Sequence, residues 1–190
     1  MSVLNRERVL RAATSSFLAH GYGSSVDVIA RRAGVAKQTV YHHFPSKDEL
    51  FKEVARDLAR KVLVQLEGEE RDIRKTLLRF GKAYRRRVLG AQGINAFRTL
   101  VPEVPRFRAL ARGMYAASAG ETVRRLADYL EKKMDEGALR RDEPLFAAEM
   151  LLGMLVGVDR VKRLFAVPVE EGDAPRAARV VECFLKAYQK

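Results

Sequence analysis

The apolar positions of this chain recur at helical spacing, most clearly near its beginning. Between residues 26 and 33 apolar side chains stand at i, i+3, i+4 and i+7, a spacing that places them on one face of a helix. Gly34 follows, and glycine commonly ends helices because it tolerates a positive φ. Val40 and Phe44, at i and i+4, mark a second buried face. The pattern predicts two short helices joined by a glycine turn.

The same periodicity continues to the end of the chain, and no strand-like alternation interrupts it. It predicts seven further helices, over residues 5–20, 47–67, 71–89, 94–101, 106–136, 144–165 and 174–188. Ser46 and Glu49 form the S-x-x-E pattern that opens helices, so the helix after the second short one begins at Lys47. Gly68–Glu70 is the one candidate joint between domains. We therefore expect an all-α protein of about nine helices.

The face of the second short helix opposite its buried residues is polar. At about 100° per residue, Gln38 and His42 point directly away from Val40. Thr39 and Tyr41 flank them, and Lys37 stands at the N-terminus of the helix. Side chains of this kind suit the major groove of DNA, because base edges and phosphates both offer hydrogen-bond acceptors there. A solvated helix in an ordinary helical domain is the alternative interpretation.

The run IARRAGVAKQTVYHHFPSKDELF, residues 29–51, resembles the DNA-binding signature of the TetR family of bacterial transcriptional regulators. It matches in the Ala-Gly-Val turn, in the Thr-Val-Tyr centre of the second helix, in the phenylalanine that closes this helix, and in the Ser-Lys pair that opens the next. The match covers the first third of the chain. The remainder is similar to AefR-like or AcrR-like regulatory domains in length and helical pattern.

This resemblance implies a domain organisation and a function. A helix-turn-helix DNA-binding domain would occupy residues 1–46, and a ligand-binding and dimerisation domain residues 47–190, with the helix over residues 47–67 connecting the two. The protein would be a sequence-specific transcriptional regulator, a repressor that a small-molecule effector releases from its operator.

The resemblance also assigns DNA-binding residues one by one. They are Ser25, Lys37, Gln38, Thr39, Tyr41, His42, His43 and Lys47. Lys37, His43 and Lys47 would contact mainly phosphates. The reading face, formed by Gln38, Thr39, Tyr41 and His42, would contact base edges in the major groove. Ser25 is also expected to cap the helix that follows it. Ala36 departs from the motif, because many members carry a helix-capping serine at this position.

A pocket for the effector is implied by the resemblance as well, between residues 71 and 165. Residues on or beside the predicted inward faces could line it: Phe80, Tyr84, Phe97, Phe107, Met114, Tyr115, Met150 and Met154. Methionine adapts to varied shapes, so the expected ligand is hydrophobic. The alternative is that these residues are ordinary core.

The predicted helix over residues 144–165 is apolar nearly all round between Leu145 and Val158, so it must be covered on two sides. The last helix presents a second apolar stripe, formed by Val181, Phe184, Leu185 and Tyr188. We expect these two helices to join a homodimer, because soluble proteins seldom expose so large an apolar surface. A two-fold symmetric dimer in turn requires a near-palindromic operator in double-stranded DNA.

The net charge points to a polyanionic partner. The formal charge is +12, with 36 basic and 24 acidic residues. Residues 1–67 contribute +4, residues 68–101 contribute +6 and residues 102–190 only +2. The predicted nucleic-acid footprint therefore lies toward the N-terminal end. The basic cluster Lys82, Arg85, Arg86 and Arg87 falls outside the motif and is interpreted as a solvated helix face, with long-range attraction to DNA as the alternative.

The chain has a single cysteine, Cys183, which fits a reducing cytoplasm. We expect it to be a small buried side chain, and a redox switch is the alternative. No secretory signal is evident at the start. The longest apolar stretch, residues 145–158, is too short for the roughly 20 residues that span a bilayer. We predict a cytoplasmic protein without a membrane partner.

Catalytic chemistry has little support in the sequence. His42 and His43 are adjacent, so on a helix they point about 100° apart and do not form a metal pair. No glycine-rich phosphate loop or G-x-S-x-G elbow is present. We expect no cofactor and no enzymatic activity. The alternative is a helical enzyme or carrier whose N-terminal helices do not read DNA.

Overall fold

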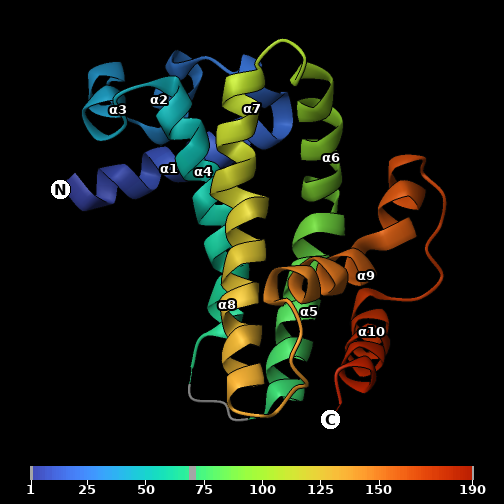
Figure 1. Ribbon diagram of the computed structural model, residues 1–190. Helices are drawn as coiled ribbons and strands as arrows, with labels where there is room; N and C mark the ends of the chain where they lie inside the picture. The colour runs from blue at the N-terminus through green and yellow to red at the C-terminus, as the bar shows by residue number, and fades with distance from the viewer. Residues whose placement is uncertain (1, 69–71, 190) are drawn as a thin grey trace. The chain divides into compact units, whose positions relative to one another are not determined.

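The computed structural model describes residues 2–68 and 72–189, and every regular element in this part of the chain is a helix (Figure 1). The α-helices are α1 (Ser2–His20), α2 (Val26–Ala33), α3 (Lys37–His43), α4 (Lys47–Leu63), α5 (Ile73–Leu89), α6 (Ala91–Leu100), α7 (Arg108–Tyr115), α8 (Glu121–Asp135), α9 (Pro144–Leu164) and α10 (Asp173–Ala187). The 3-10 segments are η1 (Gly21–Gly23), η2 (Val64–Leu66) and η3 (Val101–Glu103), and η4 (Ala116–Gly120) is π-helical. The all-α prediction is confirmed.

The long helix predicted over residues 106–136 consists of three consecutive segments. α7, η4 and α8 follow one another without an intervening loop, so the described residues form nine helical stretches, as predicted. Of the predicted joint Gly68–Glu70, the last two residues lie outside the described part of the chain.

Contacts between residues divide the chain into two units. Unit 1 comprises the chain up to Leu58 together with Asn95–Ser118, and unit 2 comprises Ala59–Ile94 with Ala119–Lys190. The helices α4 and α6 therefore contribute to both units. The predicted domain boundary between residues 46 and 47 stays a prediction, but the inclusion of α7 in unit 1 was not visible in the sequence.

Unit 1 is built on an apolar cluster to which α1, α2, α3, the first turns of α4 and α7 contribute. Its fully or nearly fully buried members include Val9, Ala13, Phe17, Ile29, Val40, Phe44, Leu50, Phe51 and Leu110. The rings of Phe17 and Phe51 meet edge to face, with centroids 4.6 Å apart. The cluster supports α3 through Val40 and Phe44, so the opposite face of that short helix is left outward.

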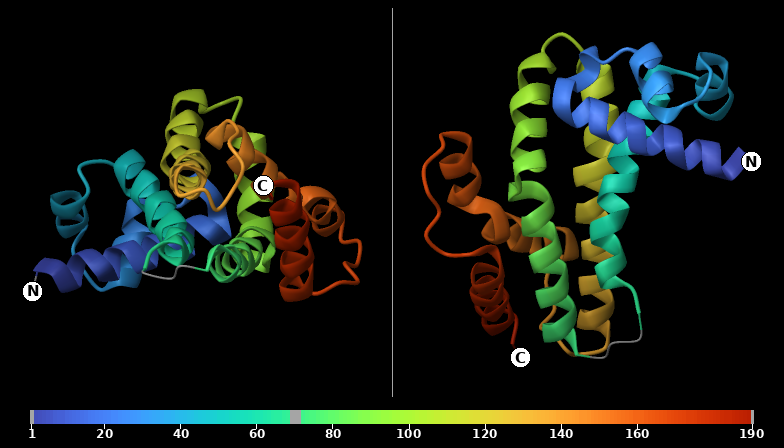
Figure 2. Two further views of the ribbon diagram at one scale, coloured as in Figure 1. Left: turned by 60° about the horizontal axis from the view of Figure 1, so that its bottom comes forward. Right: turned by 180° about the vertical axis from the view of Figure 1, so that it is seen from behind.

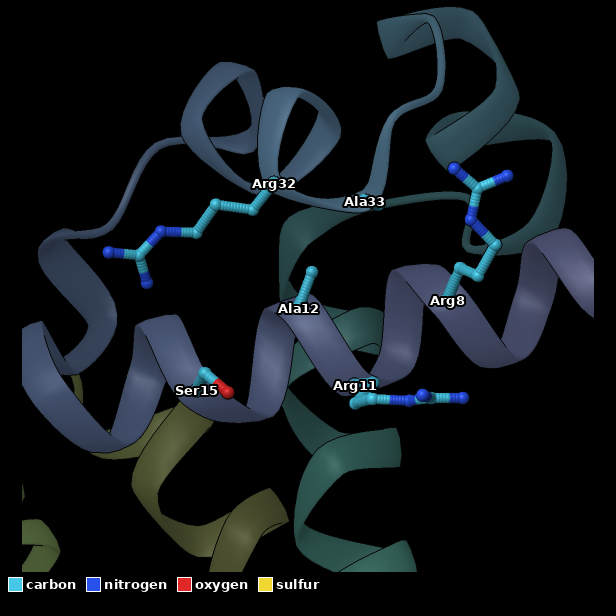
Figure 3. Close-up of a pocket in the computed structure, with 6 residues that line it drawn as sticks. All are labelled: Arg8, Arg11, Ala12, Ser15, Arg32 and Ala33. Carbon is cyan, nitrogen blue, oxygen red and sulfur yellow. The ribbon is translucent and has the colours of Figure 1, made fainter.

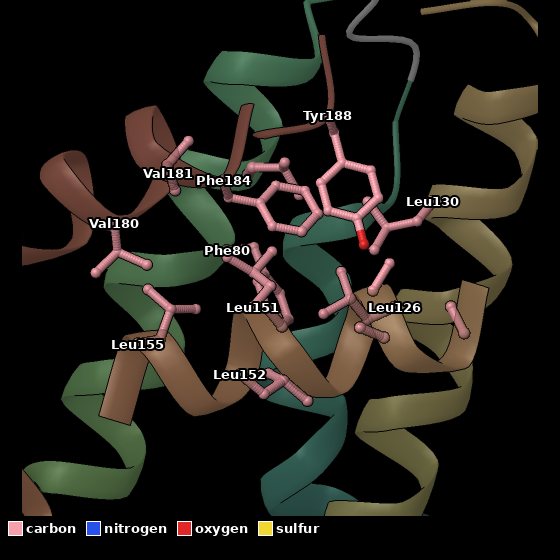
Figure 4. Packing of buried hydrophobic residues seen from close by; sticks show 14 of the residues in the cluster. Phe80, Leu126, Leu130, Leu151, Leu152, Leu155, Val180, Val181, Phe184 and Tyr188 are labelled. Atoms are coloured by element: carbon pink, nitrogen blue, oxygen red, sulfur yellow. The ribbon is translucent and has the colours of Figure 1, made fainter. Parts of the chain in front are cut away.

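Unit 2 packs α9 among α5, α8 and α10 (Figure 4). Leu151 and Leu155 of α9 are completely buried beside Phe80 of α5 and Leu126 of α8. The apolar character of α9 on several sides is thus largely explained by contacts within one chain. The rings of Phe184 and Tyr188 stack with centroids 4.6 Å apart and close this core from α10.

The apolar stripe of α10 is core, which corrects the prediction that it forms the dimer contact. Val181, Phe184 and Tyr188 are at most 1% exposed, because they face α5 and α9 within the same chain. Apolar side chains do remain exposed on α9 and directly after it: Leu145, Phe146, Val158, Val161 and Phe165. They separate into two groups, because Gly157 takes φ 35° and ψ −134° and bends α9 sharply (Figure 2).

Arg85 is buried, so the interpretation of residues 82–87 as a solvated face is wrong at this position. Its side chain is 0% exposed and donates hydrogen bonds to the carboxylates of Asp159, at 2.7 Å, and Asp173, at 2.9 Å. It also donates to the backbone carbonyl of Leu155. A buried guanidinium needs such partners, since an unpaired charge inside a protein is very costly.

Two further observations concern the surface of the chain. Cys183 is exposed on α10, contrary to the expectation of a buried side chain, because the buried face of that helix is taken by Val180, Val181 and Phe184. Among the described residues, none of the helices is both long enough and apolar enough to cross a membrane.

Candidate nucleic-acid interface

The ends of α2 are defined by a capping serine and a glycine that can both be recognised in the sequence. The hydroxyl of Ser25 accepts a hydrogen bond from the backbone N–H of Val28 and so caps α2, as predicted. Gly34 adopts φ 64° and ψ 41°, the left-handed conformation that ends α2. Ala36 occupies the N-cap position of α3 without a side-chain cap. The two helices are thereby held in a helix–turn–helix arrangement (Figure 1).

The outward face of α3 carries the residues expected to read DNA. Val40 and Phe44 are 1% and 3% exposed, which confirms the predicted buried side of this helix. Lys37, Gln38, Tyr41 and His42 are exposed, and Thr39 and His43 are half-buried beside them. The surface of α3 therefore presents an amide, hydroxyls, imidazoles and an ammonium group without any carboxylate of its own.

An acidic neighbour modifies this face. The ammonium of Lys37 forms an ion pair with the carboxylate of Asp27, across 3.0 Å, and this contact raises the pKa of Lys37. Both side chains are more than half exposed. Asp27 lies in the first turn of α2, ten residues before Lys37 in the sequence. A phosphate that binds Lys37 has to compete with this carboxylate.

Lys47, at the start of α4, is held in a small polar cluster. Its ammonium lies 4.2 Å from the ring centroid of Tyr22, and burial lowers the pKa of Lys47 although the charge of Asp48 acts in the opposite direction. The Tyr22 hydroxyl donates a hydrogen bond to the Asp48 carboxylate. The Ser46 hydroxyl accepts a hydrogen bond from the N–H of Glu49, which confirms the predicted cap of α4.

Tyr22 was not singled out in the sequence, yet it joins several parts of unit 1. Its ring lies 5.2 Å from that of Phe51 in α4 and 5.4 Å from that of Phe107, which precedes α7. Gly21, the residue before it, approaches the side chain of Thr99 in α6 so closely that an added Cβ would lie 2.5 Å from it. Pro102 and Pro105 mark a turn between α6 and α7, but no sequence signal revealed what that turn packs against.

The eight residues expected to line an effector pocket are divided between the units. Phe80, Tyr84, Met150 and Met154 belong to the core of unit 2, where the rings of Phe80 and Tyr84 stack at 5.8 Å. Phe107 and Met114 pack on the core of unit 1. The other two, Phe97 and Tyr115, are 38% and 61% exposed. The structure thus brings four of the eight residues together, in the hydrophobic core of unit 2.

Comparison with known proteins matches both parts of the chain to described families. Residues 9–54 match the family described as "Bacterial regulatory proteins, tetR family". Residues 75–190 match the family described as "AefR-like transcriptional repressor, C-terminal domain". The HTH-type transcriptional regulator YhgD of Bacillus subtilis (strain 168), itself uncharacterized, is 38% identical over 63 residues, which are 33% of each chain. The matched stretch thus spans about one third of that relative.

Solved structures resemble the whole chain. A TetR-family regulator from Mesorhizobium loti MAFF303099 shares 26% identity and a TM-score of 0.78, with 100% of this chain and 99% of the other covered. The Flavonoid-responsive Regulator FrrA shares 29% identity and a TM-score of 0.73, with 97% of each chain covered. The likeness therefore extends through the C-terminal helices.

Proposed function

This chain belongs to the TetR family of bacterial transcriptional regulators, and we propose that it is a repressor that reads double-stranded DNA through α3 and is released by a small hydrophobic effector. The observation that carries the reading role is the outward face of α3. Gln38 can make paired hydrogen bonds to an adenine edge, and the hydroxyls and imidazoles beside it can bond to other base edges. The proposal places the protein in the cytoplasm and gives it no enzymatic role.

Phosphate contacts would set the register of α3 in the groove. Lys37 stands at the N-terminus of α3, and Lys47 stands at the capped start of α4, where free backbone N–H groups favour an anion. His43, half-buried, is the third candidate. Contacts of this kind carry no sequence information, but they orient the reading face.

We propose that the active form is a homodimer. The support is the exposed apolar side chains on both sides of the bend in α9, where Phe146 is 55% exposed, Val158 67% and Val161 53%. A second copy would cover these side chains across a two-fold axis, and the helix α10 could take part through its partly buried and exposed residues. Two reading heads then require half-sites roughly 34–36 Å apart, or a multiple of that distance, in a near-palindromic operator.

Release by an effector would be a population shift. An effector that binds better to a form unsuited to the operator lowers DNA affinity, and operator DNA must weaken effector binding by the same factor. α4 contributes to both units and is the proposed lever. Because the structurally similar FrrA is described as flavonoid-responsive, flat aromatic compounds such as flavonoids are the first class to screen.

Selection from a random duplex pool tests the central claim. The full chain is incubated with the pool at moderate salt, and bound sequences are recovered over several rounds. We expect one near-palindromic motif to be enriched. The absence of any enriched motif, together with binding that does not distinguish selected from random duplex, would refute the proposed repressor function.

A further inference from the structure

An open groove of about 330 Å3 lies between α1 and α2, outside the reading face (Figure 3). Its walls are formed by Arg8, Arg11, Ala12 and Ser15 of α1 and by Arg32 and Ala33 of α2. Three guanidinium groups thus border one groove. Ala12 and Ala33 have small side chains that leave space between the arginines, and Ser15 adds an exposed hydroxyl.

The hydrogen bonds that these arginines form in the described part of the chain go to neutral acceptors. Arg8 donates a hydrogen bond to the backbone carbonyl of Gly34, at 3.3 Å, and Arg32 donates one to the hydroxyl of Ser16, at 3.1 Å. Both acceptors are neutral. None of the three guanidinium groups forms an ion pair with a carboxylate among the residues the structure describes. Arg6, on the same helix, does form one, with Glu53 at 2.9 Å.

The arrangement of the three side chains indicates what shape of anion the groove suits. In Figure 3 the side chains of Arg8 and Arg32 lie toward opposite ends of the groove, and that of Arg11 lies along the near side of α1. They do not converge on one point, as they would around a single phosphate. Separate positive groups along an open groove suit an anion that is itself extended and repeats its charge, such as the backbone of a nucleic-acid strand.

The groove also leads toward the reading helix. Arg8 contacts Gly34, which ends α2, and Lys37 begins α3 three residues later. One end of the groove thus adjoins the turn that leads into α3. Arginine is well suited to such contacts, because its planar fork of donors matches phosphate oxygens.

We propose that the groove of Arg8, Arg11 and Arg32 binds the phosphate backbone of duplex DNA as a second contact surface, in addition to α3. The inference rests on the proposed DNA-binding function and names a further binding site for it. The groove contributes affinity that does not depend on base sequence. It accordingly acts on every duplex alike and raises the salt dependence of binding.

The first test compares two double variants of the full chain. Arg11→Gln/Arg32→Gln removes two charges from the groove, whereas Arg31→Gln/Arg112→Gln removes two exposed charges that do not line it. Arg8 is left in place because it contacts the turn. Binding to a fluorescently labelled duplex of mixed sequence is measured by anisotropy at several KCl concentrations, and circular dichroism confirms that both variants are folded.

The groove variant is expected to bind the duplex more weakly at about 0.1 M salt, and the slope of log K against log[salt] should become shallower by ~0.9 for each lost phosphate contact. The control pair should change both quantities much less. Equal losses in the two variants would show that only the summed charge matters, and would overturn the proposal. Unchanged binding of the groove variant would overturn it as well.

A second test locates the DNA directly. Ser15→Cys, introduced together with Cys183→Ser, is labelled with a photoactivatable cross-linker and irradiated in the presence of the duplex. Cross-links to DNA are expected. The wild-type chain labelled at exposed Cys183 is the matched control and should give few. The absence of cross-links from position 15 at saturating duplex would contradict the proposal.

Failure of this inference can be distinguished from failure of the proposed function. A chain that selects a DNA motif and loses it on Gln38→Ala, but shows neither groove effect nor cross-link, reads DNA without the groove. A chain that binds no duplex at all fails both proposals.

Discussion

The hydroxyl of Tyr22 donates a hydrogen bond to the carboxylate of Asp48, and this contact joins η1 to the first turn of α4 across 26 residues of sequence. The same ring lies under the ammonium of Lys47 and beside Phe107. The start of α4, where a phosphate contact is proposed, is therefore tied to α1 and to the segment before α7. The Tyr22 ring thus contacts both Lys47 and the segment before α7.

The ionisation of Tyr22 predicts a loss of stability at alkaline pH. Burial, together with the hydrogen bond and the negative charge of Asp48, raises the pKa of Tyr22 from 10.0 to about 12. A raised folded pKa stabilises the protein below the unfolded value of 10.0, and this stabilisation is lost as the pH rises toward 12. Tyr22→Phe should therefore remove part of the alkaline destabilisation. Urea unfolding of both proteins at a series of pH values measures it.

The matched control for this experiment is Tyr115→Phe, because Tyr115 is 61% exposed. It should leave the pH dependence of the wild type unchanged. An identical decline of wild type and Tyr22→Phe between pH 10 and 12 would show that the contact with Asp48 does not contribute.

Gln38 is the residue from which we expect the clearest effect on sequence preference. Gln38→Ala removes a side chain able to bond two atoms of one base, which should cost about 1–3 kcal/mol of binding and relax the preference at one base pair of each half-site. The measurement is a set of titrations with the selected duplex and its single-base variants. Gln92→Ala, at an exposed position of α6, should bind as the wild type does. Unaltered preference in Gln38→Ala would place the reading face elsewhere.

Arg85 is expected to be one of the most sensitive positions in unit 2. Arg85→Met leaves the carboxylates of Asp159 and Asp173 without their buried partner, which should destabilise the protein by about 3–5 kcal/mol. Arg86→Met, at the next and exposed position, should change the free energy of unfolding by no more than about 0.5 kcal/mol. Denaturant unfolding of both variants is the test.

If Arg85→Met does not fold, Arg85→Lys retains the charge but cannot reach all three acceptors, and an intermediate loss is expected. Equal stability of the Arg85 variants and Arg86→Met would show that the buried network contributes little.

The exposed apolar residues that follow the bend in α9 predict how the proposed dimer can be disrupted. Val161 is 53% exposed in the single chain, so Val161→Glu should leave the fold intact while placing a charge where a second copy would pack. We expect sedimentation at micromolar concentration to show a dimer for the wild type and mostly monomer for the variant. Val101→Glu, at a 46% exposed position of η3, is the control and should remain dimeric. A wild-type monomer would refute the proposed assembly.

Features that depend on local chemistry could be predicted from the sequence. The hydroxyls of Ser25 and Ser46 cap the helices that follow them. Gly34 takes the left-handed conformation, which costs glycine little conformational energy because it has no Cβ. The exposed face of α3 follows from Val40 and Phe44, because a short helix with two buried positions at i and i+4 has only one outward side. For the same reason, the residues proposed to read DNA could be identified from the sequence.

Features that depend on which helices meet were decided only by the tertiary structure. Periodicity identifies an apolar face but not the surface that covers it, so Phe184 and Tyr188 were assigned to a partner chain although α5 and α9 cover them. Arg85 belongs to a run of basic residues, and its burial depends on carboxylates 74 and 88 residues further along the chain. The packing of Phe107 on Tyr22 and the open groove between α1 and α2 likewise bring together residues that share no local signal. The sequence thus determined the helices, their caps and the outward face of α3, because these depend on neighbours within a few residues. Long-range packing decided which charged side chains are buried, as Arg85 is, and which line an open groove, as Arg8, Arg11 and Arg32 do.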